Sequence, residues 1–546
     1  MSRLVFICVL LFASTQSCSV FVPLAFAQHE HSAGDVAKLG KVSFSVSCDP
    51  SVQAKFSSAV AMLHSFWYER AKETFSAVAE KDPTCVMANW GIAMSYYHPL
   101  WQPPSHADLK AGAAAVQKAK LVGVKTQRER NYVAAIEVFY RDFEKTDHAT
   151  RALAYENAME KLQGRYPDDH EAAIFHALAL LATAPPTDKA YVNQKRAGAI
   201  LEPLFAEEPE HPGIAHYIIH AYDCPPLAQR ALDAARSYAK IAPDSPHALH
   251  MPSHIFTRLG LWQESIDSNL ASAASAKKNN APGDELHAKD YLMYAYLQGA
   301  QDQEAKGLLQ SSPLGRRSDP AYMAWLYAMG TSPARYAVER HQWGEAATLV
   351  VPANTFPGGR YAWTEANLHF ARSLGLSHTG KTEGARVEVM KLTSLRDSLA
   401  AIGDKYWADQ VEIQREIAEA WISLAEDKSD EALRQMRAAA EHEDATEKHP
   451  VTPGVILPAR ELLGDMLLQL KQPAQAMLEF EATLKTAPNR FNALAGAARA
   501  AKLSGDEEKA KTYYAKLISM CERADGNRPE LEEARTLLRG SVVAVQ

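Results

Sequence analysis

The sequence predicts an all-α fold, a solenoid of stacked antiparallel helix pairs. Three observations favour it: residue types recur at intervals of 34 positions, apolar residues follow the helical spacing between prolines, and the alternation typical of half-buried strands is missing. The chain has 546 residues, more than one compact core usually holds. Length therefore favours several domains or an elongated repeat array.

Composition excludes several classes of protein. Hydrophobic residues make up 47% and charged residues 23%, which is ordinary for a globular chain. The 58 Lys+Arg against 65 Asp+Glu give a net charge of −7 without a basic run, so the charge expected for a nucleic-acid partner is missing. After residue 27 no stretch approaches the roughly 20 apolar residues that span a bilayer. We expect no nucleic-acid partner and no transmembrane segment in the mature chain.

The first 27 residues have the pattern of a secretory signal peptide. Arg3 precedes an apolar run over residues 4–13, and Ala25 and Ala27 flank a plausible cleavage point. The mature chain then begins at Gln28 and is exported, to the periplasm or the extracellular space. Residues 28–47 are expected to form a disordered amino-terminal tail.

Export affects the interpretation of the four cysteines that remain in the mature chain. Cys48 and Cys85 bracket the first predicted helical hairpin, and an oxidising compartment favours a disulfide between them. The alternative is two buried free thiols. Cys224 and Cys521 lie far apart in sequence and are expected to remain free.

The repeated residues are small at one position, large and apolar at the next, and proline at the end of the pair. The set Ala71, Phe75, Val78 and Pro83 recurs in kind as Ala197, Leu201, Leu204 and Pro209, as Ala231, Ala235, Tyr238 and Pro243, and as Ala476, Phe480, Thr483 and Pro488. This pattern resembles the tetratricopeptide repeat (TPR) family, most clearly over residues 52–118, 178–279 and 457–524. The resemblance implies a right-handed solenoid whose concave groove binds a protein or peptide partner.

The same pattern has a physical reading. Small residues let two helices approach closely, and proline ends the second helix. Each pair buries little surface alone, so neighbours must stack. We predict TPR-like repeats with a histidine-rich groove over 48–310, more divergent helical pairs over 311–441, a polar loop over 442–456 and carboxy-terminal repeats over 457–546. The loop, from His442 to Gly454, is either a solvated connector, which we favour, or a segment folded over the groove.

Histidines cluster in one part of the chain. Seven of the 20 lie between residues 211 and 287: His211, His216, His220, His247, His250, His254 and His287. His216 and His220 are four residues apart and share a helix face, and His250 and His254 repeat this pair 34 positions later. Pro252 is tolerated only near a helix start, which places His250 in a first turn.

The TPR resemblance implies that both pairs line the concave groove. Packed helices lie roughly 8–10 Å apart and i,i+4 side chains roughly 6 Å, so the four imidazoles would converge on one ion at about 2.1 Å. His247, His287 and Asp290 are candidate additional ligands. Asp223 is a candidate carboxylate ligand, or an acceptor that orients a ligating histidine. Zinc and copper both suit neutral imidazole, as do iron and nickel.

Two functions remain open. The first is an exported TPR scaffold that binds a protein or peptide in its groove, with a histidine-rich metal site as an added feature. The alternative is a metal-dependent enzyme or metal-handling protein that uses His216, His220, His250 and His254, with Asp223, Asp290 or Glu447 as base. The histidines could instead be polar groove residues that hydrogen-bond a peptide or water.

Other candidate residues are weaker. His64 and His98 also lie 34 positions apart, but aromatic neighbours surround both, which is typical of packing residues. Cys224 follows His220 by four residues, but the two prolines after it argue against a nucleophile at this position.

Overall fold

The computed structural model describes residues 37–100, 103–311, 323–352 and 355–543. The expected signal peptide and the first part of the expected tail lie outside the described residues, so neither expectation is tested. The described helices all belong to one compact unit, Lys38–Gln546.

Regular structure in the described ranges is helical throughout, with no strand. The α-helices are α1 (Gln53–His64), α2 (Tyr68–Lys81), α3 (Val86–Ser95), α4 (His106–Val122), α5 (Gln127–Tyr140), α6 (His148–Arg165), α7 (His170–Ala182), α8 (Val192–Glu207), α9 (Pro212–Tyr222), α10 (Leu232–Ile241), α11 (Pro246–His250), α12 (Pro252–Leu259), α13 (Trp262–Lys278), α14 (Pro282–Gln298), α15 (Asp302–Ser311), α16 (Met323–Val338), α17 (Trp343–Ala346), α18 (Ala362–His378), α19 (Thr382–Ala401), α20 (Lys405–Ala425), α21 (Ser429–Asp444), α22 (Ala459–Gln469), α23 (Pro473–Thr486), α24 (Phe491–Leu503), α25 (Glu507–Met520) and α26 (Pro529–Val543). Short 3₁₀ turns are η1 (Pro50–Val52), η2 (Ala228–Ala231) and η3 (Gly359–Tyr361).

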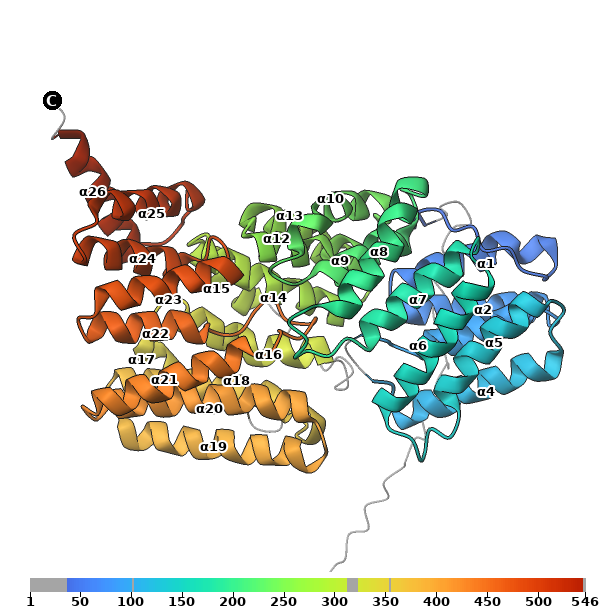
Figure 1. The fold of residues 1–546 in the computed structure, drawn as a ribbon, viewed down its shortest axis with the longest axis horizontal. Helices are drawn as coiled ribbons and strands as arrows, with labels where there is room; N and C mark the ends of the chain where they lie inside the picture. Colours follow the sequence, from blue (N-terminus) through green and yellow to red (C-terminus); the bar gives the residue numbers. More distant parts are fainter. Residues whose placement is uncertain (1–36, 101–102, 312–322, 353–354, 544–546) are drawn as a thin grey trace, which may run out of the picture. The chain divides into compact units, whose positions relative to one another are not determined.

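Successive helices pack against one another along the chain (Figure 1). Their crossings use the small and large residues of the repeat. A Cβ added to Gly91 would lie 2.4 Å from the ring of Phe75, and one added to Gly496 would lie 2.4 Å from the ring of Phe480. Only a residue without a side chain lets these helices come so close. The predicted all-α solenoid of helix pairs is confirmed.

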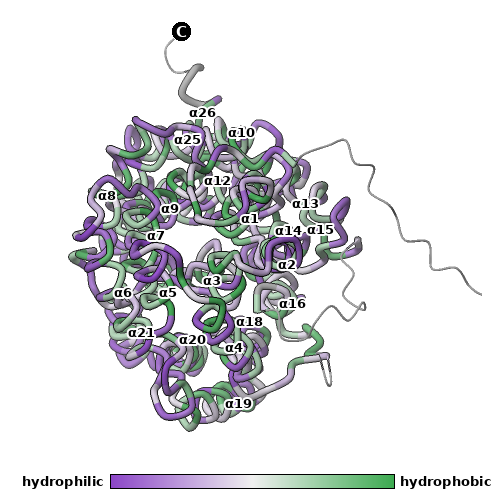
Figure 2. The backbone as a smooth tube through the Cα atoms, turned by 90° about the vertical axis from the view of Figure 1, so that its right-hand side faces the viewer, coloured by the Kyte–Doolittle hydropathy of each residue, from purple (hydrophilic) through white to green (hydrophobic). Residues whose placement is uncertain are grey.

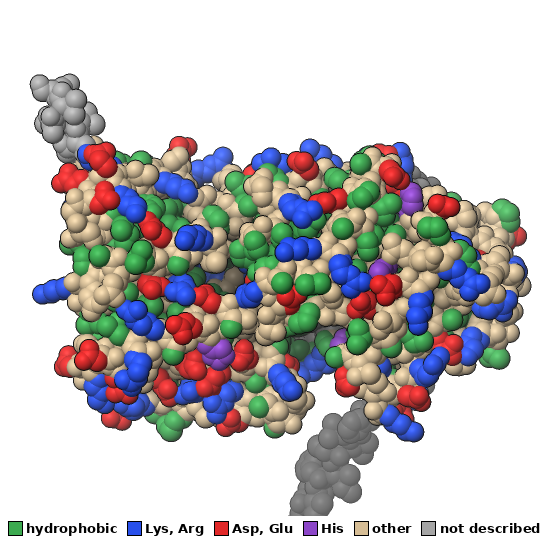
Figure 3. All heavy atoms as spheres, viewed as in Figure 1, with side chains coloured by type: hydrophobic (Ala, Val, Ile, Leu, Met, Phe, Trp, Pro, Cys, Tyr) green, Lys and Arg blue, Asp and Glu red, His purple; other side chains and the backbone are tan. Residues whose placement is uncertain are grey.

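The helices carry both hydrophobic and hydrophilic residues, because each helix of a stacked pair packs on one side and faces solvent on another. Hydrophilic and hydrophobic stretches alternate along the backbone in Figure 2, and acidic and basic side chains are interspersed over the face seen in Figure 3. Within the described part of the chain, no helix combines the length and the apolar character needed to cross a membrane.

Residues 38–47 have no regular structure but are packed, in contrast to the disordered tail expected there. Phe44 is 1% exposed, and its ring centroid lies 5.4 Å from that of Trp90 and 5.1 Å from that of Tyr132. The backbone N–H of Ser47 donates to Glu129 at 2.6 Å. Burial of one aromatic side chain can hold such a segment against the first helices.

A disulfide joins Cys48 to Cys85, with the two sulfur atoms 2.01 Å apart. It connects the segment before η1 to the residue that precedes α3, and so closes the hairpin of α1 and α2. Cys224 and Cys521 are free and buried, as expected.

The polar loop differs from its prediction in bounds and in burial. Helix α21 continues to Asp444 and α22 begins at Ala459, so the connection is residues 445–458, called the 445–458 loop below. Apart from Ala445, none of its residues is exposed. The solvated connector that we favoured is therefore wrong, because the loop packs against other elements of the chain.

Candidate metal centre

Six buried or half-buried histidines come together from four helices of the region between residues 212 and 298. They are His216 and His220 on α9, His247 and His250 on α11, His254 on α12 and His287 on α14. Pro252 begins α12 and separates it from α11, so His250 ends a helix instead of lying in a first turn. These histidines are neighbours in the structure, although the helix that was expected to carry the second pair is split.

The first histidine group consists of His216, His220 and His247. The Nε2 atom of His216 lies 3.1 Å from Nε2 of His220 and 3.1 Å from Nε2 of His247. One ligand atom from each residue lies within 4.8 Å of the other two. Three nitrogens so close together have the spacing of atoms that share one metal ion at about 2.1 Å.

The second histidine group consists of His250, His254 and His287, all buried. The Nε2 atoms of His250 and His254 are 3.0 Å apart, and one ligand atom from each of the three residues lies within 4.8 Å of the others. The sequence predicted one site built on four histidines. The structure instead divides six into two groups, because His247 on α11 contacts His216 on α9, whereas His250, one turn later, contacts His254 on α12.

Backbone contact determines the tautomer of His216. Its Nδ1 lies 2.6 Å from the carbonyl oxygen of His64. A carbonyl only accepts hydrogen bonds, so Nδ1 carries the proton of the neutral ring and Nε2 presents a lone pair. That lone pair points at His220 and His247.

Two side chains determine the tautomers in the second group. Nδ1 of His250 lies 2.7 Å from Oδ1 of Asn269, whose amide Nδ2 donates to Ser265 at 2.8 Å and thereby identifies Oδ1 as an acceptor. Nδ1 of His254 lies 2.9 Å from a carboxylate oxygen of Asp223. Both Nδ1 atoms donate, so the two Nε2 atoms that face each other at 3.0 Å both present lone pairs.

Burial keeps these imidazoles neutral. It lowers the pKa of His216 to about 3 and that of His287 to about 3. Burial and the nearby histidines also hold the pKa values of His220, His247 and His250 well below the usual range. A neutral ring is the form that ligates a metal ion.

Aromatic rings form the walls around the two groups. Phe66 stacks on His220 and His247, with ring centroids 5.6 Å and 5.5 Å away, and meets His216 edge-on at 4.4 Å. Its backbone φ of 52° lies in the left-handed region, which is costly for a bulky residue. At the second group, the ring of Tyr291 meets the ring of His250 edge-on, with the two ring centroids 4.6 Å apart.

Asp223 links the second group to two cations. It accepts from Arg258 Nε at 2.8 Å and from Lys448 Nζ at 2.8 Å, in addition to His254. Burial alone would raise the pKa of Asp223, but the charges of Lys448 and Arg258 hold it well below its usual range. Asp223 therefore accepts a hydrogen bond from His254, one of the candidate ligands.

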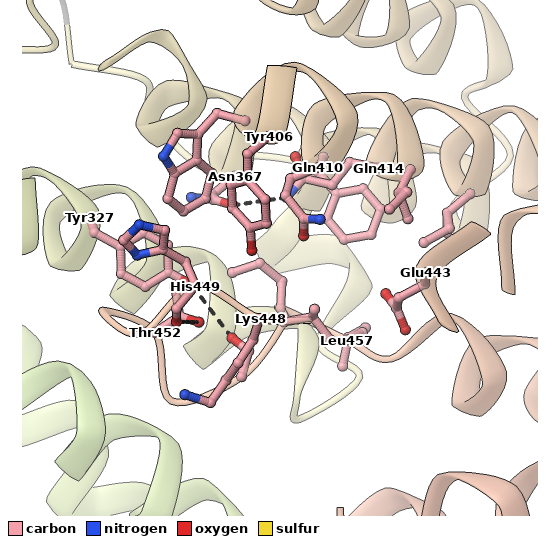
Figure 4. Close-up of a pocket in the computed structure, with 17 residues that line it drawn as sticks. Tyr327, Asn367, Tyr406, Gln410, Gln414, Glu443, Lys448, His449, Thr452 and Leu457 are labelled. Atoms are coloured by element: carbon pink, nitrogen blue, oxygen red, sulfur yellow. Dashed lines mark hydrogen bonds between the residues drawn. The ribbon is translucent and has the colours of Figure 1, made fainter. Parts of the chain in front are cut away.

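The 445–458 loop contacts two residues that adjoin the second group and is anchored on both sides. Tyr291 donates to the carbonyl of Thr452 at 3.0 Å, and Lys448 reaches Asp223. On its other side, His449 and Tyr406 line a small pocket, where Lys448 points its amino group away from Tyr406 (Figure 4). The ring of His449 lies 5.0 Å from that of Trp407 on α20. Because the loop has contacts on both faces, it forms part of the wall beside the second group.

Two residues considered for the site have other partners. Asp290 lies outside both groups and accepts from Thr331 on α16 at 2.8 Å, so the structure does not place it as a ligand. Glu447 accepts from Lys189 at 2.8 Å.

The chemistry of Cys224 also argues against a catalytic role. Burial raises the pKa of the Cys224 thiol to about 12, which opposes a nucleophilic role.

A further buried group escaped sequence analysis. Glu171 bridges two histidines, with His64 Nε2 at 2.9 Å and His211 Nε2 at 3.1 Å. His64 was interpreted as a packing residue, yet it also orients His216 through its backbone carbonyl. The contact from His216 to this carbonyl joins positions 152 apart and involves a backbone atom, so no residue type in the sequence indicates it.

Comparisons with known proteins find distant similarity to solved structures and no family. No family model matches the chain, and no curated protein matches it. A human IFIT1 dimer with m7Gppp-AAAA is 13% identical, with a TM-score of 0.33, over 80% of this chain and 90% of that one. Naa15/Naa10 bound to HypK-THB is 13% identical, with a TM-score of 0.24, over 90% of this chain and 74% of that one. The P58(IPK) TPR domain is 14% identical, with a TM-score of 0.21, over 68% of this chain and 99% of that one. At these TM-scores the likeness carries no argument about what this chain binds.

Proposed function

We propose that this chain is a metal-binding protein in which each three-histidine group holds one transition metal ion, zinc or copper. The observation that carries the proposal is the pair of Nε2 atoms of His250 and His254, 3.0 Å apart with both protons on the opposite nitrogens. Two lone pairs repel each other at this distance. A cation between them turns the repulsion into coordination.

The supporting contacts match those of ligating histidines elsewhere. A histidine that binds a metal usually donates its other N–H to a carboxylate, a carbonyl or a similar acceptor, which orients the ring. His254 donates to Asp223, His250 to Asn269 and His216 to the carbonyl of His64. Hydrogen bonds to a carboxylate, an amide oxygen and a backbone carbonyl therefore orient these three rings so that each Nε2 atom faces the other histidines of its group.

Three neutral nitrogens leave room for a further ligand on each ion. Structural zinc sites are closed by four protein ligands, whereas catalytic sites keep an open position. We therefore retain the metal-dependent enzyme as the more specific form of this proposal. The metal would supply Lewis acidity or an activated water, and the protein's own residues would orient the ligands and enclose the site.

Metal analysis of the full chain, purified without a His tag, tests the proposal. We expect bound zinc or copper after incubation with either ion and removal of the excess. The double variant His216→Ala with His250→Ala should lose stoichiometric metal and keep its helical circular dichroism, because the helices are held by their apolar contacts. His106→Ala is the matched control, since this side chain is 71% exposed and far from both groups in the sequence. A wild-type chain that takes up neither metal would refute the proposal.

A scaffold that binds a peptide remains the second candidate. What supports it is the repeat pattern of helix pairs itself. A peptide bound over the second histidine group would have to displace the 445–458 loop, which already contacts Asp223 and Tyr291. Any peptide site is therefore better sought on another part of the helical repeats.

Export also remains a proposal, and the disulfide between Cys48 and Cys85 supports it. Disulfides persist in oxidising compartments and are rare in the cytosol. Amino-terminal sequencing of the mature protein should begin at Gln28. A soluble cytoplasmic form that retains Met1 would contradict this expectation.

A further inference from the structure

We infer that the two histidine groups form one dinuclear centre, in which the two metal ions share a bridging oxygen ligand such as hydroxide. This inference rests on the proposed function, because it requires that both groups bind metal. In a dinuclear centre the two ions are neighbours and share a ligand, whereas two independent sites would share none.

Helix α11 supplies one ligand to each group and so places the groups side by side. His247 belongs to the first group and His250 to the second, and they are three residues apart on the same helix. Residues at this spacing lie on adjoining turns with their Cβ atoms about 5–6 Å apart. No intervening element can therefore separate the two groups along α11.

Ring contacts between the groups show the same closeness. The ring centroids of His220 and His254 are 6.0 Å apart, and those of His247 and His250 are 6.2 Å apart. Rings so near one another allow two ions, each about 2.1 Å from its own nitrogens, to lie within reach of a shared ligand. Two-metal sites in enzymes typically separate their ions by about 3.5–4 Å.

Charge balance favours an anionic bridge. The six imidazoles are neutral donors, so two divalent ions would bring four positive charges into a buried space. The nearby carboxylate of Asp223 is already paired with Arg258 and Lys448. Isolated charge is costly to bury. A metal ion lowers the pKa of bound water to about 7, and a hydroxide between two ions would offset part of their charge.

Copper loading of the full chain tests the inference by electron paramagnetic resonance. We expect two Cu²⁺ ions per chain and loss of nearly all of the copper signal, because a single-atom bridge couples the two unpaired spins. The single variants His220→Ala and His287→Ala each remove a ligand from one group only. Each should bind one ion and recover the full, uncoupled signal of that ion. His106→Ala should behave as the wild type does.

The outcomes separate this inference from the proposed function. Two bound ions with the full additive signal would mean independent sites, which overturns the dinuclear centre and leaves metal binding intact. One bound ion in the wild-type chain would overturn the dinuclear centre and would restrict the proposed metal binding to one of the two groups. A chain that binds no copper and no zinc would refute the proposed function, and the dinuclear centre with it.

Discussion

Asn269 is the residue that orients His250, and it allows a test that leaves every proposed ligand in place. Its Oδ1 atom accepts from His250 Nδ1 at 2.7 Å, and its side chain is fully buried on α13. Asn269→Ala should weaken metal binding at the second group by about 10–100-fold, the usual effect of losing such a partner. Binding at the first group should change little, because His216 takes its contact from a backbone carbonyl.

Titration of the apo protein with zinc, monitored by calorimetry, measures both effects. Asn279→Ala is the matched control, since Asn279 is exposed, directly follows α13, and has a side chain that donates to Ser275 on that helix. Equal loss of affinity in the two asparagine variants would contradict the orienting role.

The neutral histidines also make the metal-free chain sensitive to acid. The folded pKa values of His216 and His287 are about 3, whereas an unfolded histidine titrates near 6.5. Below about pH 6.5 the unfolded chain binds protons that the folded chain does not, so the free energy of unfolding falls. Each of these histidines contributes about 1.4 kcal/mol per pH unit, present in full above about pH 6.5 and lost as the pH falls toward 3. Glu443, whose pKa burial raises to about 7, acts in the opposite direction, as do Asp465 and Glu461, whose pKa values burial also raises. These acids are fewer than the buried histidines whose pKa is lowered, so the histidines determine the sign.

Urea unfolding with a chelator, between about pH 7 and about pH 5, measures this slope. Zinc-loaded protein should lose less stability over the same interval, because the bound ion favours the neutral imidazoles of the folded state. Equal stability at both pH values in the metal-free chain would contradict the prediction.

At the scale of elements, the disulfide constrains one helical hairpin. Cys48 and Cys85 are 37 residues apart and enclose α1 and α2. Cys48→Ser with Cys85→Ser should lower the free energy of unfolding by about 3–4 kcal/mol on the chain-entropy account. Thermal unfolding with and without a reductant measures the effect. Cys224→Ser is the control, because Cys224 is a free thiol and its variant should respond to the reductant as the wild type does.

At the scale of the whole chain, a buried ion cluster joins segments that are distant in sequence. Arg490, fully buried before α24, contacts Glu461 on α22 at 2.7 Å and Glu339 after α16 at 2.8 Å. Arg490→Ala would leave two buried carboxylates without a cation and should destabilise the chain by about 3–5 kcal/mol. Arg499→Ala should cost less than about 1 kcal/mol, since its pair with Glu533 is partly exposed. Chemical unfolding of both variants checks the difference, and similar losses would contradict it.

Local residue patterns are enough to predict the all-α repeat and the approximate position of the candidate site. Both follow from local spacing: small and apolar residues at helical intervals form the pairs, and histidines four residues apart share a face. His216, His220, His250 and His254 could be selected for this reason, together with His247 and His287. The disulfide between Cys48 and Cys85 could also be predicted, because the two cysteines bracket one hairpin.

The tertiary structure alone decided how those histidines divide and what surrounds them. The split into two groups depends on which neighbouring helix His247 and His250 face, and the tautomers depend on the carbonyl of His64 and on Asn269. The loop was misjudged because its polar composition is typical of a solvated connector. Its burial results from Lys448 reaching Asp223, 225 positions earlier in the chain. Contacts over such separations are set by the packing of distant helices, and local residue patterns do not encode them.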